Sequence, residues 1–272
     1  MAELPKKARV VVIGGGVIGC SIAYHLTKIG WSDVVLLERQ QLTSGTTWHA
    51  AGLVGQLRTS INMTKLARYT SELYRGLEDE TGQATGYRQC GSISIAATAE
   101  RFEELKRSAS MAKVFDLEVN VLSVDQIAEQ YPLSNTDDLF GGIQIPSDGY
   151  ANAIDITQAL AKGARKRGAE IFQNTKVSEI LHTGGKVTGV RTPAGDIEAD
   201  HVVICGGMWS RDLAASVGFN VPLHACEHYY VLFESVEGLH PELPVLRDYD
   251  ACTYYKYDAG KLLVGAFEPT AK

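Results

Sequence analysis

Hydrophobic residues near the start of the chain follow the order strand, helix, strand. Residues 8–13 (ARVVVI) and 33–38 (DVVLLE) are short, continuous apolar runs, which are typical of strands buried in a parallel sheet. Between them, residues 17–30 repeat isoleucine and leucine at helical spacing, and Gly30 stands where such a helix ends. Parallel strands joined by a helix form a right-handed crossover, so this stretch predicts a β-α-β unit.

The pattern changes further along the chain. Helices are expected over residues 62–80 and 155–167, and a buried strand over residues 200–205 (DHVVIC). Three strands with alternating polarity and many tyrosines follow Pro222, as in an antiparallel sheet. They are expected over residues 227–233, 252–258 and 261–267.

These elements predict an α/β fold with two interleaved domains. A Rossmann-like nucleotide-binding domain is combined with an α+β substrate domain that carries a mostly antiparallel sheet. The expected bounds of the nucleotide-binding domain are residues 1–84 and 150–220. Those of the substrate domain are residues 85–149 and 221–272.

Composition and charge narrow the function without defining it. The 272 residues are 45% hydrophobic and carry a formal net charge of −6, and no basic stripe suggests a nucleic-acid partner. No apolar run reaches the roughly 20 residues that span a bilayer. The chain enters a strand too soon for a leader peptide, so we expect a cytoplasmic protein. The five cysteines lack CxxC spacing, which predicts reduced thiols and no metal site.

A glycine-rich loop joins the first strand to the first helix. Gly14, Gly16 and Gly19 match GxGxxG, in which the glycines allow a tight turn, close approach of a pyrophosphate, and close packing of helix on strand. Val17 and Ile18 are the first residues of the helix, and the helix N-terminus offers free N–H groups to the phosphates. The loop therefore predicts nucleotide binding.

An acidic residue closes the second strand. Glu38 comes 19 residues after Gly19, where a carboxylate binds the adenosine ribose hydroxyls and disfavours a 2′-phosphate. The neighbouring Arg39 is a candidate to cover the adenine. NADP is therefore disfavoured, whereas NAD and FAD remain open.

Three further segments carry a resemblance to a known family. They are residues 44–53 (SGTTWHAAGL), 200–209 (DHVVICGGMW) and 243–248 (LPVLRD). With the β-α-β unit, they resemble the dimethylglycine dehydrogenase and sarcosine dehydrogenase family, FAD-dependent amine oxidoreductases similar to D-amino-acid oxidase. The resemblance runs through essentially the whole chain and implies FAD as the cofactor. It also implies that His49 bonds covalently to the 8α-methyl carbon of the flavin.

The resemblance implies a set of cofactor-binding residues around His49. Small neighbours let the edge of the flavin ring lie against the backbone. The residues implied in this segment are Gly45, Thr46, Thr47, Trp48, His49, Ala50, Ala51, Gly52 and Leu53. The resemblance adds Val177, toward the adenine, and Trp209, which follows the strand over 200–205.

The resemblance also implies that a hydride equivalent passes from an N-methyl group to the flavin. The family places a histidine and a tyrosine on the sheet of the substrate domain, and the matching residues here are His228 and Tyr254. Strand alternation puts Tyr254 and Lys256 on one face. Arg58 either pairs with a substrate carboxylate through its planar fork or is an ordinary surface arginine.

Substrate, acceptor and chain length follow from the same resemblance. The substrate expected is sarcosine, dimethylglycine or a longer N-methylated amino acid, and the electron acceptor is electron-transfer flavoprotein or oxygen. The family's chains are several times longer and carry a C-terminal part that binds tetrahydrofolate. We therefore expect this chain to be C-terminally truncated.

Two other functions remain open. One is a non-catalytic regulatory subunit resembling that of pyruvate dehydrogenase phosphatase, which residues 222–230 (PLHACEHYY) favour. That relative lacks the flavin-linking histidine, so His49 favours the enzyme. The other is an NAD-dependent dehydrogenase, which fits the glycine loop but leaves His49 unexplained.

Overall fold

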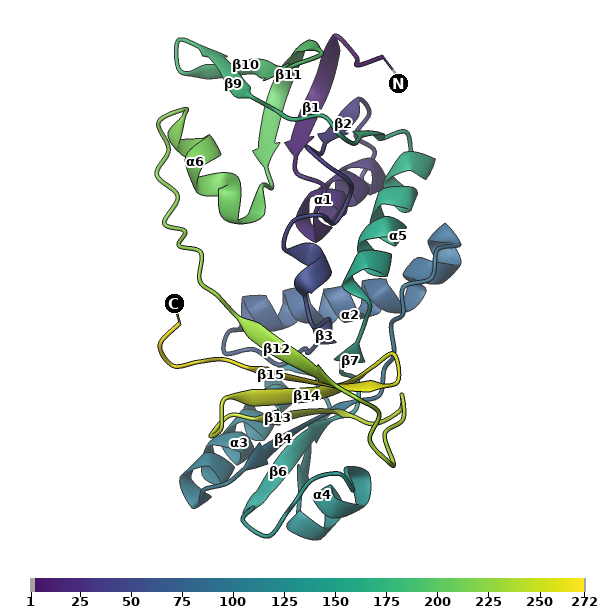
Figure 1. Cartoon of the computed structure of the whole chain (residues 1–272), viewed down its shortest axis with the longest axis vertical. Helices are drawn as coiled ribbons and strands as arrows, with labels where there is room; N and C mark the ends of the chain where they lie inside the picture. Colours follow the sequence, from purple (N-terminus) through teal and green to yellow (C-terminus); the bar gives the residue numbers. More distant parts are fainter. Residues whose placement is uncertain (1–2, 272) are drawn as a thin grey trace. The chain divides into compact units, whose positions relative to one another are not determined.

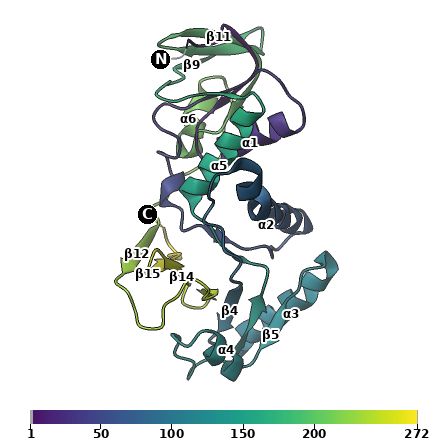
Figure 2. The ribbon, with the colours of Figure 1, turned by 90° about the vertical axis from the view of Figure 1, so that its right-hand side faces the viewer.

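The computed structural model describes residues 3–271 and divides them into two compact units, drawn in two views in Figures 1 and 2. The expected domain ends at residues 1 and 272 lie outside the described residues. Unit 1 comprises the residues up to Ala50, Gly76–Thr85 and Ala153–Ala225. Unit 2 comprises Ala51–Arg75, Gly86–Asn152 and the residues from Cys226 onward.

Unit 1 is built on a six-stranded sheet in the order β8-β2-β1-β11-β10-β9 (Figure 1). The first four strands are parallel, and the last two continue the sheet in antiparallel fashion. Their bounds are β1 (Lys7–Ile13), β2 (Val34–Leu37), β8 (Glu170–Phe172), β9 (Glu179–Thr183), β10 (Lys186–Thr192) and β11 (Gly195–Ile204). Every residue of β2 is buried, as its continuous apolar run predicts.

Helices pack on this sheet through small residues and apolar clusters. They are α1 (Val17–Lys28), α5 (Ala153–Lys166) and the short α6 (Ser210–Ala215). The first two lie side by side (Figures 1 and 2). Gly163 of α5 makes room for the Tyr24 ring of α1, since a Cβ at Gly163 would lie only 2.8 Å from that ring. Leu213 of α6 packs against a buried cluster that includes Val11 and Ile197. The β-α-β unit predicted from the sequence is confirmed.

Unit 2 carries a seven-stranded sheet in the order β12-β15-β14-β13-β4-β6-β5. All neighbouring pairs are antiparallel except β13 and β4, which are parallel. The prediction of a mostly antiparallel sheet is therefore confirmed. The bounds are β4 (Ser92–Ala96), β5 (Asn120–Leu122), β6 (Gly141–Ile145), β12 (Tyr229–Phe233), β13 (Val245–Asp248), β14 (Thr253–Asp258) and β15 (Lys261–Ala266).

Short helices and one ribbon complete the chain. Helix α3 (Ala99–Ala112) lies against β4 and β6 through Leu105 and Ala109, and α4 (Val124–Gln130) begins at a capping box between Ser123 and Gln126. The remaining elements are α2 (Ile61–Thr81), β3 (Leu53–Val54), β7 (Gly149–Tyr150), η1 (Thr47–His49), η2 (Lys113–Phe115) and η3 (Gly207–Trp209). No helix within residues 3–271 has both the length and the apolar character needed to cross a membrane.

The segment after Ala50 packs in unit 2, whereas the sequence grouped residues 51–75 with the nucleotide-binding domain. Strand β3 pairs with β7, and the N–H of Ala151 donates to the carbonyl of Gly52 at 2.8 Å. Gly52 has φ +78, and a Cβ there would lie 2.0 Å from the carbonyl oxygen of Ala151. The buried Lys256 Nζ donates to the carbonyl of Ala51 at 2.7 Å. Pairing with distant residues therefore decides which unit holds this segment.

Candidate functional site

A cavity of about 760 Å³ lies in unit 1 at the N-terminus of α1. Its walls come from the glycine loop, the end of β2, the loop that follows it, the segment before β9 and the turn after β11. The predicted cofactor residues that line it are Gly14, Gly16, Val17, Ile18, Glu38, Arg39, Gly45, Thr46, Thr47, Val177 and Trp209. Residues far apart in the sequence therefore converge on one hollow.

The glycines of the loop are required by close backbone contacts. Gly14 has φ +115, and a Cβ there would lie 2.4 Å from the carbonyl oxygen of Cys205. A Cβ at Gly19 would lie 1.9 Å from the carbonyl oxygen of Gly14. Gly19 is not among the residues that line the cavity, and it allows helix α1 to approach the loop. Any side chain at either position would disrupt the loop.

Thr47 ties the segment around His49 to the helix N-terminus. Its hydroxyl accepts a hydrogen bond from the N–H of Val17 at 3.0 Å, and its side chain is buried. Gly16 provides no side-chain cap for α1, so Thr47, thirty residues later, satisfies one of the free N–H groups. A Cβ at Gly16 would lie 3.0 Å from the Thr47 hydroxyl, so this glycine also makes room for the contact. Sequence analysis did not predict this capping role.

Glu38 organises the loop as well as facing the cavity. It is 9% exposed, and its two carboxylate oxygens accept from the N–H groups of Gly15 at 2.6 Å and Gln40 at 2.8 Å. Each carboxylate oxygen has two lone-pair sites, so both can accept a further hydrogen bond from ribose hydroxyls. The carboxylate is therefore held in place before any nucleotide arrives.

Replacing Glu38 is expected to weaken flavin binding. Glu38→Ala removes the carboxylate that is expected to accept from the ribose hydroxyls, and hydrogen bonds to charged groups contribute about 1.5–3 kcal/mol each. Flavin content should fall when the variant is expressed with limiting riboflavin. Glu198→Ala, an exposed position on β11, is the matched control. Equal flavin content in the two variants would refute the ribose assignment.

Arg39 and Trp209 form a stacked pair on the cavity wall. The guanidinium carbon of Arg39 lies 4.0 Å from the centroid of the Trp209 ring, a cation–π geometry. Trp209 ends η3 and is 41% exposed. The pair offers a planar surface to an aromatic ligand. The sequence analysis predicted each residue as a cofactor contact but did not predict that they stack on each other.

The structure separates the rest of the predicted cofactor residues from this cavity. Trp48 and His49 are exposed, with ring centroids 3.7 Å apart, and neither lines the cavity. Ala50 follows them at the end of the first segment of unit 1. Ala51, Gly52 and Leu53 belong to unit 2. Thr47 is thus the link between the cavity and the exposed imidazole of His49.

The two catalytic candidates meet in unit 2. The hydroxyl of the buried Tyr254 lies 3.5 Å from Nε2 of His228, and the imidazole stacks on Phe267 with centroids 4.5 Å apart. Glu268 places a carboxylate oxygen 3.8 Å from Nδ1 of His228. The Tyr254 ring lies over Gly265, where a Cβ would be 2.1 Å from it. Sequence analysis did not identify Phe267, Glu268 or Gly265 as neighbours of this pair.

The cavity fits a dinucleotide with an adenosine ribose. It combines the backbone cradle at Gly14 and Gly16, a helix N-terminus and the fixed carboxylate of Glu38. Among residues 3–271, no group of three or more histidine, cysteine, aspartate or glutamate side chains is arranged to hold a metal ion. Fold and cavity together are those of a dinucleotide-binding protein.

Comparison with known proteins identifies the family. Residues 9–272 match the family described as "FAD dependent oxidoreductase" (DAO). The chain therefore belongs to the DAO family of FAD-dependent oxidoreductases.

Relatives agree with this assignment. The chain is 44% identical over 266 residues to 4-methylaminobutanoate oxidase (formaldehyde-forming) of Paenarthrobacter nicotinovorans, covering 98% of this chain and 32% of that protein. It is 42% identical over 271 residues to human mitochondrial sarcosine dehydrogenase, covering 97% and 29%. It is 40% identical over 272 residues to the mouse mitochondrial pyruvate dehydrogenase phosphatase regulatory subunit, covering 99% and 31%. The chain thus spans about a third of the length of these relatives.

A solved structure supports the fold. L-proline dehydrogenase from P. horikoshii superposes with a TM-score of 0.88 at 23% identity, covering 96% of this chain and 70% of that one. The arrangement of helices and strands is thus that of a known fold.

Proposed function

We propose that this chain is the FAD-binding and substrate-binding part of an oxidoreductase that demethylates an N-methylated amino acid. The observation that carries the proposal is the cavity at the α1 N-terminus, where Thr47 joins the glycine loop to the segment that holds His49. The names of the relatives, sarcosine dehydrogenase and 4-methylaminobutanoate oxidase, support an N-methyl amino acid as the substrate class.

Residues of unit 1 would hold the cofactor. The backbone of the glycine loop and the α1 N-terminus would contact the pyrophosphate, Glu38 would accept from the ribose hydroxyls, and the pair of Arg39 and Trp209 would stack on the adenine. When bound, FAD supplies the acceptor for the hydride. His49 would bond to the flavin through an imidazole nitrogen, since neutral imidazole is a good nucleophile near neutral pH.

Residues of unit 2 would handle the amine. Burial raises the pKa of Tyr254, and the charge of Tyr230 raises it further by a smaller amount. Its hydroxyl therefore stays protonated at neutral pH and positions the substrate as a hydrogen-bond donor. His228, oriented by Phe267 and Glu268, is then the residue placed to take a proton from the amine.

Location and electron acceptor complete the proposal. We propose a cytoplasmic protein that passes its electrons to electron-transfer flavoprotein or to oxygen, and tetrahydrofolate as a ligand of the longer proteins of this type.

A non-catalytic regulatory role is the second candidate, since one relative at 40% identity is a phosphatase regulatory subunit. Anaerobic mixing of the purified, flavin-loaded protein with sarcosine, dimethylglycine or 4-methylaminobutanoate separates the two. Bleaching of the flavin absorbance with release of formaldehyde is expected for the enzyme. Persistent yellow colour with all three amines would favour the regulatory role.

A further inference from the structure

His49 lies midway along the chain between two anchored residues. Two residues before it, the hydroxyl of the buried Thr47 accepts from the N–H of Val17 at 3.0 Å. Two residues after it, the carbonyl of Ala51 accepts from Nζ of Lys256 at 2.7 Å. The three residues between these anchors are exposed. Two residues of chain span at most about 7 Å, so each anchor limits the positions that the imidazole can reach.

The residues between the anchors form a single turn of 3-10 helix, η1. The N–H groups of His49 and Ala50 donate to the carbonyls of Thr46 and Thr47 at 3.2 and 3.1 Å. The ring of Trp48 packs on the imidazole, with centroids 3.7 Å apart. These contacts are local to the turn, so the direction in which the turn presents the imidazole depends on the contacts that hold its two ends.

Lys256 lies at a buried position of the sheet in unit 2, where lysine is rare. It is 4% exposed and stands opposite Leu263 of β15. A buried ammonium group costs free energy unless it is paired and hydrogen-bonded. Besides the Ala51 carbonyl, Nζ has a carboxylate oxygen of Asp258 at 3.0 Å and the ring centroid of Tyr150 at 5.0 Å. An apolar side chain would fill this position without that cost, but it could not donate to the carbonyl of Ala51.

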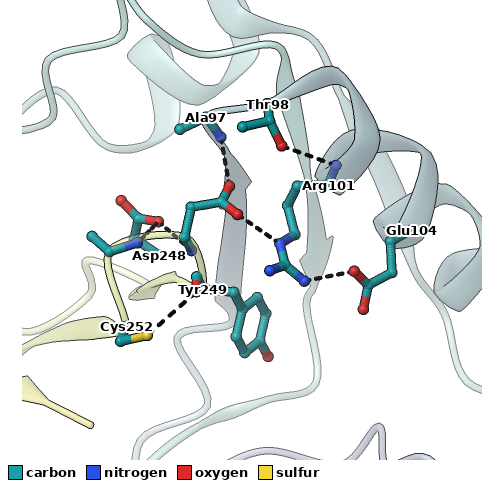
Figure 3. A network of polar contacts seen from close by, with 9 residues as sticks. Ala97, Thr98, Arg101, Glu104, Asp248, Tyr249 and Cys252 are labelled. Carbon is teal, nitrogen blue, oxygen red and sulfur yellow. Dashed lines mark hydrogen bonds and ion pairs between the residues drawn. The ribbon is translucent and has the colours of Figure 1, made fainter. Parts of the chain in front are cut away.

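Strand β14, which carries Lys256, is itself held firmly in unit 2. Strand alternation places Lys256 and Tyr254 on the same face, and both side chains are buried. The turn that leads into β14 is fixed by Asp250, which accepts from Arg101 at 3.0 Å in the network of Figure 3. The carbonyl of Ala51 is therefore held on the face of the sheet from which Tyr254 projects.

We propose that Thr47 and Lys256 are positioning residues for the covalent attachment of FAD to His49. The proposal rests on the proposed function, to which the bond between His49 and the flavin belongs, and it assigns the residues that present the imidazole. The new bond joins an imidazole nitrogen to the 8α carbon of the flavin. It replaces the N–H bond of the imidazole and one C–H bond of the methyl group. Dioxygen takes the two hydrogens and becomes hydrogen peroxide.

Attachment depends on position more steeply than binding does. Misplacement of a reacting group by about 1 Å can cost about 100-fold in rate. Binding of FAD is instead distributed over the walls of the cavity, including the glycine loop and Glu38. Loss of either anchor should therefore slow attachment while FAD still binds.

The rate of covalent attachment tests the two anchors. The full chain is expressed with limiting riboflavin, mixed in air with a saturating excess of FAD, and precipitated with trichloroacetic acid at successive times. Flavin fluorescence of the pellet measures attached FAD, and ultrafiltration before precipitation measures total bound FAD. Lys256→Met and Thr47→Val should each slow attachment by at least about tenfold at full occupancy by FAD. Lys256→Arg and Thr47→Ser keep the donor and the acceptor, so they should restore the rate.

The control is Lys261→Met, which removes a partly exposed lysine paired with Glu234 on the same sheet. It should attach FAD at the unmodified rate. If Lys256→Met does not fold, the pair Thr47→Val and Thr47→Ser gives the same comparison.

Three results would overturn the proposal, and they differ in what else they exclude. Attachment at the unmodified rate in folded Lys256→Met and Thr47→Val overturns the positioning role and leaves the bond to His49 intact. Occupancy by FAD that falls in step with attachment, without rescue by Lys256→Arg or Thr47→Ser, assigns both residues to packing alone. An unmodified protein that binds FAD and attaches none overturns the bond to His49 itself, and with it the role of both anchors.

Discussion

Acid precipitation should leave the unmodified protein yellow and the His49→Ala variant colourless. The substitution removes the imidazole nitrogen that we propose as the covalent attachment point. It leaves the glycine loop, Glu38 and the hydrogen bond from Val17 to Thr47 unchanged, so reversible binding of FAD should persist. Because His49 is exposed, its loss should also cost little stability. Trichloroacetic acid treatment, followed by flavin fluorescence of pellet and supernatant, measures the partition.

His182→Ala is the matched control for this experiment. His182 is an exposed histidine on β9 of the same unit, so its loss should leave the flavin in the pellet. A colourless pellet from the unmodified protein, after FAD binding has been established in the native state, would exclude a covalent bond. The non-catalytic regulatory role would then be better supported, because the imidazole of His49 is the main feature that argues against it.

Removal of the Tyr254 hydroxyl or the His228 imidazole should slow flavin reduction by about 10²- to 10⁴-fold, the usual range for general acid–base groups. The variants are Tyr254→Phe and His228→Gln, and the spectrum of the bound flavin should not change. Since burial raises the pKa of Tyr254, loss of its proton should not limit the rate below about pH 10. Anaerobic stopped-flow reduction across a range of pH measures both effects.

Two further variants distinguish catalysis from packing. Gly265→Ala would place a Cβ 2.1 Å from the Tyr254 ring, so it should displace the phenol and slow reduction without removing any polar group. Tyr255→Phe alters the adjacent tyrosine, which packs against the cluster around Ile93, and should leave the rate unchanged. If Tyr254→Phe and His228→Gln each change the rate of flavin reduction by less than about threefold at every pH, both residues serve only in packing.

Local patterns sufficed to predict the elements of unit 1. The strands and helix of the β-α-β unit have strong apolar periodicity, and their observed bounds differ by only a few residues from those expected. Strand β9 begins only at Glu179, because residues 175–178 lie outside the sheet and line the cavity. Strand β11 is Gly195–Ile204, so it begins five residues before the strand expected over 200–205. The residues at which these strands begin and end depend on the segments with which they pack in the folded chain.

Contacts between residues far apart in the chain could not be predicted from the sequence. Strand β13 was not expected, because its four residues have no alternation and its pairing with β4 is nonlocal. The capping of α1 by Thr47 and the stacking of Arg39 on Trp209 each join residues at least 30 positions apart. Arg58, Asp148 and Arg247 likewise approach Gly55 from three separate segments of the chain. Residue type suggested a role for Arg58, and only the fold supplied Arg247 and Asp148 as its neighbours.

The single parallel pairing in unit 2 has a consequence for the order of folding. Strands β4, β5 and β6 come from one stretch of chain, and β12 to β15 come from another, so each group can form through local contacts as it is synthesised. Within residues 3–271, the ladder between β4 and β13 is the only strand pairing that joins the two groups, and the last segment of unit 1 lies between them in the chain. The edge of β4 must therefore wait, unpaired on that side, while Ala153–Ala225 is made. This edge is the point at which a nascent chain is most exposed to mispairing.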